Sequence, residues 1–415
     1  MAKKKIFYGW FVVAGCMMLR LGLGIPNYSM SVFLKPLCAS LGVSRGAFSA
    51  YSTFSYIATM IMLPILGVWF KKYSFKLLLW LGAAATTAVI FGYSFVTSVW
   101  QFYLLSIING IFSGMLNSIP IAMLMANWFK KKRGFATGLA FTGSGISAMI
   151  VVPLANYLIE KVSWMAAFRV CAGLYLIFML VPLLFLIKEK PEDIGLTALG
   201  SGADTEGSAA PPLQGFMLAQ ARKTPTFWAI GICMFLTGFV YMGTQNHVVA
   251  YLSDIGHSTA FASAMYSIIM AFDTVGKVVL GMLYDKIGLR KTNLYIYGLL
   301  FAAEILLLFA GYAPVAVLFA VILGMSVAVQ TGAYPVIIST LLGDKDYTVL
   351  YSNLTVLYFA GMSVGIPFSG LVYDTFGTYK MAWAGYAGVI IVIIAVLLSA
   401  EIWAKKDWEK LEKSL

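Results

Sequence analysis

The chain has 415 residues, of which 60% are hydrophobic and only 11% are charged, and its mean hydropathy is +0.86. Soluble domains carry about 25% charged residues, so this composition excludes a soluble globular protein. The formal net charge of +12 comes from short basic clusters between apolar runs, which argues against nucleic-acid binding. We therefore expect an all-α membrane protein that crosses the bilayer several times.

Twelve apolar segments are long enough to cross a bilayer core about 30 Å thick, which takes about 20 helical residues. The sequence predicts these spans at residues 8–34, 46–70, 75–96, 100–128, 134–159, 165–187, 226–252, 259–284, 292–311, 314–341, 347–373 and 379–404. The connection at 188–225 contains the run GSGADTEGSAAPP, which has no hydrophobic periodicity. We expect an N-terminal six-helix bundle at 1–187, a cytoplasmic linker at 188–225 and a C-terminal six-helix bundle at 226–415.

Basic residues mark one side of the predicted membrane protein. If both termini are cytoplasmic, the termini and cytoplasmic loops hold 22 of the 29 Lys and Arg residues, and the outer loops hold four. Cytoplasmic loops are enriched in Lys and Arg, so this bias predicts cytoplasmic termini and a multi-pass protein of the inner (plasma) membrane. The halves also repeat at an offset of 214 residues, since Gly67 corresponds to Gly281 and Pro153 to Pro367. Such repeats predict a binding site near the midplane.

A loop motif follows the eighth predicted span. Residues 281–291 read GMLYDKIGLRK, which resembles the signature GxxxDxxGxR of the major facilitator superfamily. The resemblance implies the fold of that family, twelve helices in two six-helix bundles, and a conformational latch that uses Gly281, Asp285 and Arg290. The corresponding loop of the first half has Lys71 at the position of the acid.

Three shorter stretches resemble the monocarboxylate transporters and their oxalate:formate relatives. They are YGW at 8–10, the run NWFKKKRGFATG at 127–138, and DTVGK at 273–277, where lysine replaces the usual arginine. The resemblance implies that Lys277 meets the substrate carboxylate and that Tyr28 faces the substrate. It also relates His247 to a histidine of some bacterial members.

Six ionisable residues lie inside predicted spans: Arg20, Arg169, His247, Asp273, Lys277 and Glu304. A charge at this depth costs several kcal/mol unless it is paired or meets water. Asp273 and Lys277 are four residues apart and share a helix face, which predicts an ion pair with either a structural or a substrate-binding role. Arg20 has three possible roles, as a partner of Glu304, as a partner of Asp273 or as an anion ligand.

Uncharged polar residues extend the candidate substrate site. Asn117 precedes Pro120 in a helix that the proline is expected to break, so its amide can serve either as a substrate ligand or as a contact between helices. Gln330 and Tyr334 occupy the corresponding region of the second half, and Tyr358 lies near the position of a lysine in oxalate:formate exchangers. The expected substrate-binding residues are Lys277, Tyr28, Asn117, His247, Arg20, Gln330, Tyr334 and Tyr358.

The predicted function is secondary transport rather than an enzyme activity, because no nucleotide loop, metal cluster or hydrolytic triad is recognisable. We expect a monomer without a cofactor or metal that carries a small organic monocarboxylate anion together with a proton. Asp273 is the expected main proton carrier, and His247 is the alternative because histidine titrates near neutrality. An anion exchanger of the oxalate:formate type and a non-transporting membrane sensor are the competing hypotheses.

Overall fold

A computed structural model describes residues 7–129, 133–200, 214–327, 329 and 333–412 of the chain. Within these residues the structure is helical, and its β-type pairing is limited to two isolated bridges, Phe129 with Leu199 and Gly215 with Gly343. The chain forms two compact units. Unit 1 comprises Met1–Val43 and Ile57–Ser208, and unit 2 comprises Ser44–Tyr56 and Ala209–Leu415.

Unit 1 is built around the pair formed by α1 and α7 and a second group formed by α4, α5 and α8. Its helices are α1 (Gly9–Tyr28), α2 (Met30–Leu41), α4 (Phe75–Gly92), α5 (Val99–Ser113), α6 (Ser118–Trp128), α7 (Arg133–Lys161) and α8 (Trp164–Val181), with short turns η1 (Tyr93–Phe95), η2 (Gly114–Leu116), η3 (Pro182–Leu186) and η4 (Pro191–Ile194).

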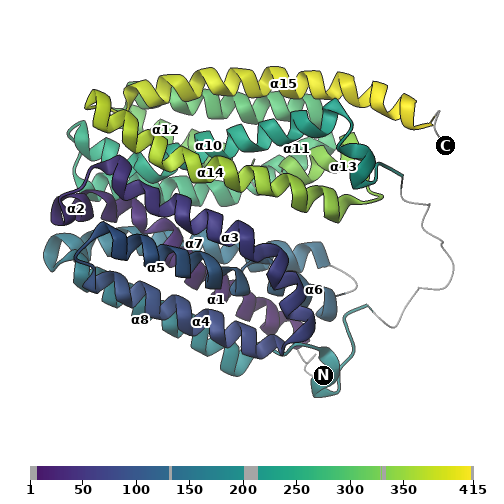
Figure 1. The fold of residues 1–415 in the computed structure, drawn as a ribbon, viewed down its shortest axis with the longest axis horizontal. Helices are drawn as coiled ribbons and strands as arrows, with labels where there is room; N and C mark the ends of the chain where they lie inside the picture. Colours follow the sequence, from purple (N-terminus) through teal and green to yellow (C-terminus); the bar gives the residue numbers. More distant parts are fainter. Residues whose placement is uncertain (1–6, 130–132, 201–213, 328, 330–332, 413–415) are drawn as a thin grey trace, which may run out of the picture. The chain divides into compact units, whose positions relative to one another are not determined.

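Unit 2 contains α9 (Leu218–Ala221), α10 (Pro225–Asp254), α11 (Thr259–Leu308), α12 (Ala313–Val327), α13 (Tyr334–Leu342), α14 (Tyr347–Phe376) and α15 (Lys380–Glu412). Helix α10 packs along α14 and α15, and α11 packs along α12 and α15 (Figure 1). Helix α3 (Arg45–Lys72) is shared, because its residues up to Tyr56 belong to unit 2 and the rest to unit 1.

The predicted all-α membrane fold is confirmed. Ten helices in the described residues are long and apolar enough to span a membrane, and the two remaining predicted spans correspond to α3 and to α12 with α13. The first span runs to Leu41 rather than to residue 34, because α2 continues α1 and ends where Gly42 adopts a left-handed φ of 64°. Helix α11 contains two predicted spans, which Gly288 separates with a non-helical φ of 77° and ψ of 176°.

Glycines let one helix in each unit contact the backbone of another. A Cβ on Gly143 of α7 would meet the carbonyl oxygen of Met17 and the amide of Leu21 in α1. In unit 2, a Cβ on Gly361 of α14 would meet the carbonyl oxygen of Phe235 and the amide of Phe239 in α10. Each residue of the first set has its counterpart 218 positions later, so the two units repeat this close packing. Small residues serve this purpose in membrane helices.

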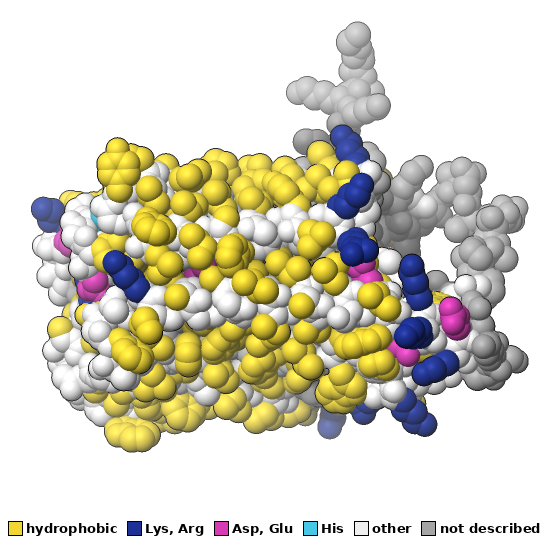
Figure 2. Space-filling view, turned by 90° about the horizontal axis from the view of Figure 1, so that it is seen from above, with side chains coloured by type: hydrophobic (Ala, Val, Ile, Leu, Met, Phe, Trp, Pro, Cys, Tyr) yellow, Lys and Arg dark blue, Asp and Glu magenta, His cyan; other side chains and the backbone are white. Residues whose placement is uncertain are grey.

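The surface has the character of a lipid-facing surface. Large apolar side chains are exposed on helices of both units, including Leu77, Trp100 and Leu104 in unit 1 and Leu318 and Ile402 in unit 2. Figure 2 shows a face on which hydrophobic side chains cover a broad band, with most Lys and Arg side chains gathered at one end, on the right. Soluble monomers rarely expose contiguous apolar surface of this extent, so the chain is a multi-pass membrane protein.

Candidate functional site

The ion pair that the sequence predicts inside α11 is present. The Nζ atom of Lys277 donates to Oδ2 of Asp273 at 2.7 Å. The aspartate side chain is only 6% exposed, whereas the lysine side chain is 36% exposed. The other carboxylate oxygen, Oδ1, is buried without a hydrogen-bond partner among the described residues. The pair therefore combines a buried acid with a partly exposed cation.

Close helix packing fixes the position of Asp273. A Cβ on Gly276 would meet the carbonyl oxygen of Met325 in α12, and a Cβ on Gly324 of α12 would meet the carbonyl oxygen of Ile269 in α11. The two helices therefore touch through their backbones on both sides of Asp273. This close backbone packing holds α11 against α12 around Asp273, which favours a binding site of fixed geometry.

A second cationic site lies in unit 1. Nη1 of Arg20 in α1 donates to Oδ1 of Asn117 at 2.5 Å, and its guanidinium lies 4.4 Å from the ring centre of Phe141 in α7. Asn117 links η2 to α6 with φ −81° and ψ −136°, so the helix is interrupted there. Tyr28 is close enough to interact electrostatically with Arg20. The structure thus brings three predicted site residues together in unit 1.

The predicted partners of Arg20 have other contacts. In unit 2, Oε1 of Glu304 accepts a hydrogen bond from Thr244 at 2.7 Å, and Asp273 pairs with Lys277. Arg169 is exposed on α8, where its Nε donates to Oγ of Ser94 at 3.3 Å.

His247 is completely buried in α10, and both ring nitrogens have partners. Nδ1 lies 3.0 Å from the hydroxyl of Tyr379, and Nε2 lies 2.9 Å from the carbonyl oxygen of Ile366 in α14. A carbonyl can only accept, so Nε2 carries a proton and Nδ1 accepts from the Tyr379 hydroxyl when the ring is neutral. Both nitrogens are thus engaged within unit 2, which fixes the orientation of the ring.

The remaining polar candidates lie elsewhere in unit 2. The hydroxyl of Tyr334 is fully buried, 2.6 Å from the Thr237 hydroxyl and 2.8 Å from the Tyr297 hydroxyl. Tyr358 is 8% exposed in α14, and a Cβ on Gly238 would meet its carbonyl oxygen. Gln330 lies outside the described residues.

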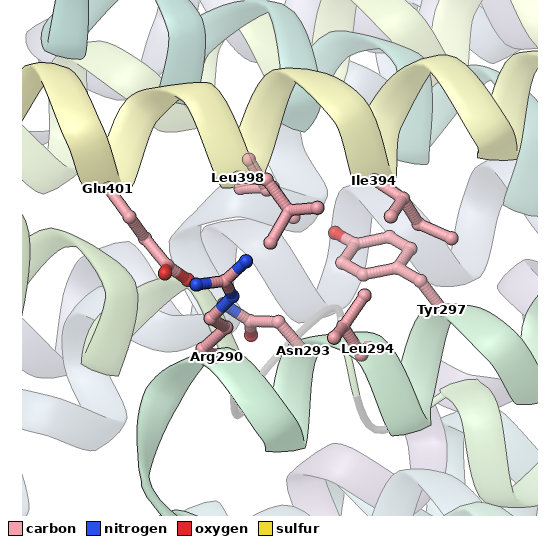
Figure 3. Close-up of a pocket in the computed structure, with 8 residues that line it drawn as sticks. Arg290, Asn293, Leu294, Tyr297, Ile394, Leu398 and Glu401 are labelled. Atoms are coloured by element: carbon pink, nitrogen blue, oxygen red, sulfur yellow. The ribbon is translucent and has the colours of Figure 1, made fainter.

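The predicted latch residues lie near the junction between the two spans of α11. Gly281 and Arg290 are exposed, and the side chain of Asp285 lies outside the described part of the chain. Arg290, Asn293 and Tyr297 of α11 line a small hollow together with Ile394, Leu398 and Glu401 of α15. Figure 3 shows the guanidinium of Arg290 pointing toward the carboxylate of Glu401, with which it interacts electrostatically.

The sequence did not point to Arg45, the first residue of α3, which forms the centre of a polar cluster in unit 2. Its guanidinium binds both carboxylate oxygens of Asp254, at 2.6 and 3.1 Å, and donates to the Tyr379 hydroxyl at 3.0 Å. It lies 3.7 Å from the ring centre of Tyr373. The backbone amides of Arg45 and Gly46 donate to Asp374 at 3.0 and 2.8 Å. The sequence offered one signal for this cluster, which is a basic residue at the start of one predicted span and acidic residues at the ends of two others.

Comparison with known proteins adds the family. A family model described as Major Facilitator Superfamily matches residues 12–352, most of the chain. The chain belongs to the major facilitator superfamily. The protein is therefore a membrane transporter and not an enzyme, as the sequence predicted.

Relatives within this superfamily narrow the relationship. Monocarboxylate transporter 12 of Rattus norvegicus is 26% identical, with 96% of this chain and 86% of that protein covered. The oxalate:formate antiporter of Oxalobacter formigenes is also 26% identical, with 80% and 76% covered. The resemblance noted in the sequence is thus confirmed. The protein is a transporter of the major facilitator superfamily that is related to the monocarboxylate transporters and to the oxalate:formate antiporter.

Solved structures agree on the fold. An inward-facing, occupied bacterial homologue of the human lysosomal transporter Spinster superposes with a TM-score of 0.77 at 13% identity, covering 97% of this chain and 99% of that one. The nucleoside transporter NupG superposes with a TM-score of 0.74 at 14% identity, covering 95% and 99%.

Proposed function

We propose that the protein is a proton-coupled symporter of small organic monocarboxylate anions that works by alternating access. The observation that carries this proposal is the pair of Asp273 and Lys277, whose cation is partly exposed while its acid is buried. Relatives of the chain include monocarboxylate transporters. The proposal includes the plasma membrane as location, cytoplasmic termini and a functional monomer.

The coupling follows from the cost of unpaired charge in a membrane interior. A substrate carboxylate that binds the Lys277 ammonium competes with Asp273 for the same positive charge. An aspartate left without its cation, with Oδ1 already unpartnered, is costly as an anion, and uptake of a proton removes that charge. Substrate and proton then bind together, with Asp273 as the main proton carrier. His247 has both ring nitrogens engaged and acts by holding α10 and α14 together.

The other predicted ligands are part of the same proposal. Tyr28, Asn117, Arg20, Gln330, Tyr334 and Tyr358 contribute polar contacts to the substrate. Lysine presents a point charge rather than the planar fork of arginine, so the site tolerates anions of different shape. Gly281, Asp285 and Arg290 form the conformational latch.

Proteoliposomes that contain the purified protein test the proposal with labelled formate, lactate and oxalate. Symport predicts net uptake that an inward proton gradient stimulates. Stimulation only by an anion inside the vesicles would identify an exchanger, which the antiporter of Oxalobacter formigenes makes the second candidate. A folded protein that moves none of these acids under either condition would favour a sensor.

Two substitutions assign the roles within the ion pair. Lys277→Ala is expected to abolish uptake, because the substrate anion and Asp273 then both lack a cation. Lys277→Arg is expected to retain uptake, since the charge is preserved. Asp273→Asn is expected to lose pH-driven accumulation while it still exchanges substrate across the membrane. Normal uptake by Lys277→Ala, or normal accumulation by Asp273→Asn, would contradict the corresponding role.

A further inference from the structure

Arg20 is a cation whose described contacts are with uncharged groups. It lies within the apolar span Gly9–Leu41, and its contacts are an amide oxygen and an aromatic ring. Among the described residues of unit 1 no carboxylate forms an ion pair with it. Amide and ring contacts orient a guanidinium but do not neutralise it, and an unmatched charge at this depth is costly. The described contacts of Arg20 therefore leave its positive charge without an anion.

The hydrogen-bonding groups around Arg20 are suited to a carboxylate. The Nε atom is buried and has no hydrogen-bond partner among the described residues. Nε and one Nη of a guanidinium form a planar fork that binds the two oxygens of a carboxylate. Because a guanidinium cannot accept, Asn117 must turn its Oδ1 toward Arg20, which leaves its Nδ2 group as a further donor. Tyr28, the last residue of α1, interacts electrostatically with Arg20.

We propose that Arg20 and Asn117 form a carboxylate-binding site in unit 1 that binds an anion even without the Lys277 ammonium. Arg20 is the ligand that supplies charge, and Asn117 is the residue that positions it. This inference rests on the proposed function for the chemical class of its ligand. It goes beyond the proposed function because it assigns the chain two cations, Arg20 and Lys277, that each bind a carboxylate.

Arg169 provides a matched control in the same unit. It also lies in a predicted span, it also stacks on an aromatic ring, with 5.2 Å to the centre of Phe95, and it donates to Ser94. It differs in that it is exposed on α8. Exposed arginines can reach water or lipid phosphate, so Arg169 does not need an anion from solution. Replacement of Arg169 therefore changes the same residue type without changing the proposed site.

The test uses acetate as the probe in ligand-observed NMR titrations of the full chain in detergent. The starting protein carries Asp273→Asn and Lys277→Gln, which removes both members of the other pair. This double variant is expected to bind acetate and not its neutral analogue acetamide. Addition of Arg20→Gln is expected to weaken acetate binding at least about tenfold, as for loss of charged hydrogen bonds. Addition of Arg169→Gln is expected to leave it within about twofold.

A second measurement does not depend on the stability of a variant. With ¹⁵N-arginine labelling of the wild-type chain, the Nε resonance of Arg20 is expected to shift on addition of acetate, and that of Arg169 is not. The inference is overturned if the folded double variant binds no acetate, if Arg20→Gln leaves binding unchanged, or if chloride displaces acetate at equal concentration. The proposed function is decided separately, by transport with the Lys277 variants.

Discussion

Replacing Arg45 by alanine removes the centre of the polar cluster at the start of α3. The substitution deletes two hydrogen bonds to Asp254, one to Tyr379 and the stacking on Tyr373. The two backbone amides that donate to Asp374 remain in place. The substitution therefore removes only the guanidinium, which is the positive charge that pairs with the Asp254 carboxylate.

The structure sets the size of the expected effect. The side chains of Arg45 and Asp254 are 13% and 21% exposed, so the pair is screened less than a surface pair but is not dry. Burial by itself lowers the pKa of Arg45, but the hydrogen bonds that its guanidinium donates to Asp254 and Tyr379 outweigh this effect and the pKa is raised overall. Hydrogen bonds to charged groups contribute about 1.5–3 kcal/mol each at most and share one desolvation cost. We expect Arg45→Ala to lower the free energy of unfolding by about 2–4 kcal/mol.

A double-mutant cycle measures the part that belongs to the ion pair. Unfolding of the detergent-solubilised protein is followed for Arg45→Ala, Asp254→Ala and the double variant, and a coupling energy of about 1–3 kcal/mol is expected. Arg169→Ala, at an exposed arginine, is the control and is expected to cost less than about 1 kcal/mol. A loss below about 0.5 kcal/mol for Arg45→Ala, or a coupling energy near zero, would refute the reasoning.

Three further predictions follow. Gly361→Ala is expected to destabilise the protein by about 1–3 kcal/mol because its Cβ meets the backbone of α10. Gly385→Ala, where a Cβ meets nothing within 4 Å, is expected to cost nothing; equal melting temperatures would contradict this contrast. His247→Gln is expected to lower the melting temperature but keep pH-driven accumulation, and loss of accumulation would make His247 the proton carrier. Asp285→Asn is expected to change cysteine accessibility labelling from the two sides more than Lys71→Gln, and equal changes would argue against an asymmetric latch.

The spans could be predicted because their determinants are local. Length and hydropathy identify a helix that crosses a bilayer, and a spacing of four residues is sufficient to place Asp273 beside Lys277. The end of the first span was missed by several residues, because Ser29 stays in helical geometry and α2 continues the chain to Leu41. A hydropathy pattern does not record this continuation.

Contacts between distant residues could not be predicted in the same way. Arg45 and Asp254 are separated by 209 residues, and Arg20 and Asn117 by 97 residues. No periodicity connects such positions, so the sequence identified Arg20 as costly without identifying its partner. The function of each candidate ligand depends on a bound anion, and one sequence carries no record of that contact. Their roles therefore stay predictions.

The backbone of Gly288 determines how much of α11 can lie in a bilayer. Its combination of positive φ with ψ near 180° is open essentially to glycine alone. Without this interruption, the 50 residues of α11 would form one rod about 75 Å long, more than twice the thickness of a hydrocarbon core. The backbone of this single residue therefore divides α11 into two membrane-spanning parts with no loop between them. Gly288, which belongs to the loop motif at residues 281–291, is thus the residue whose backbone separates the two membrane-spanning parts of α11.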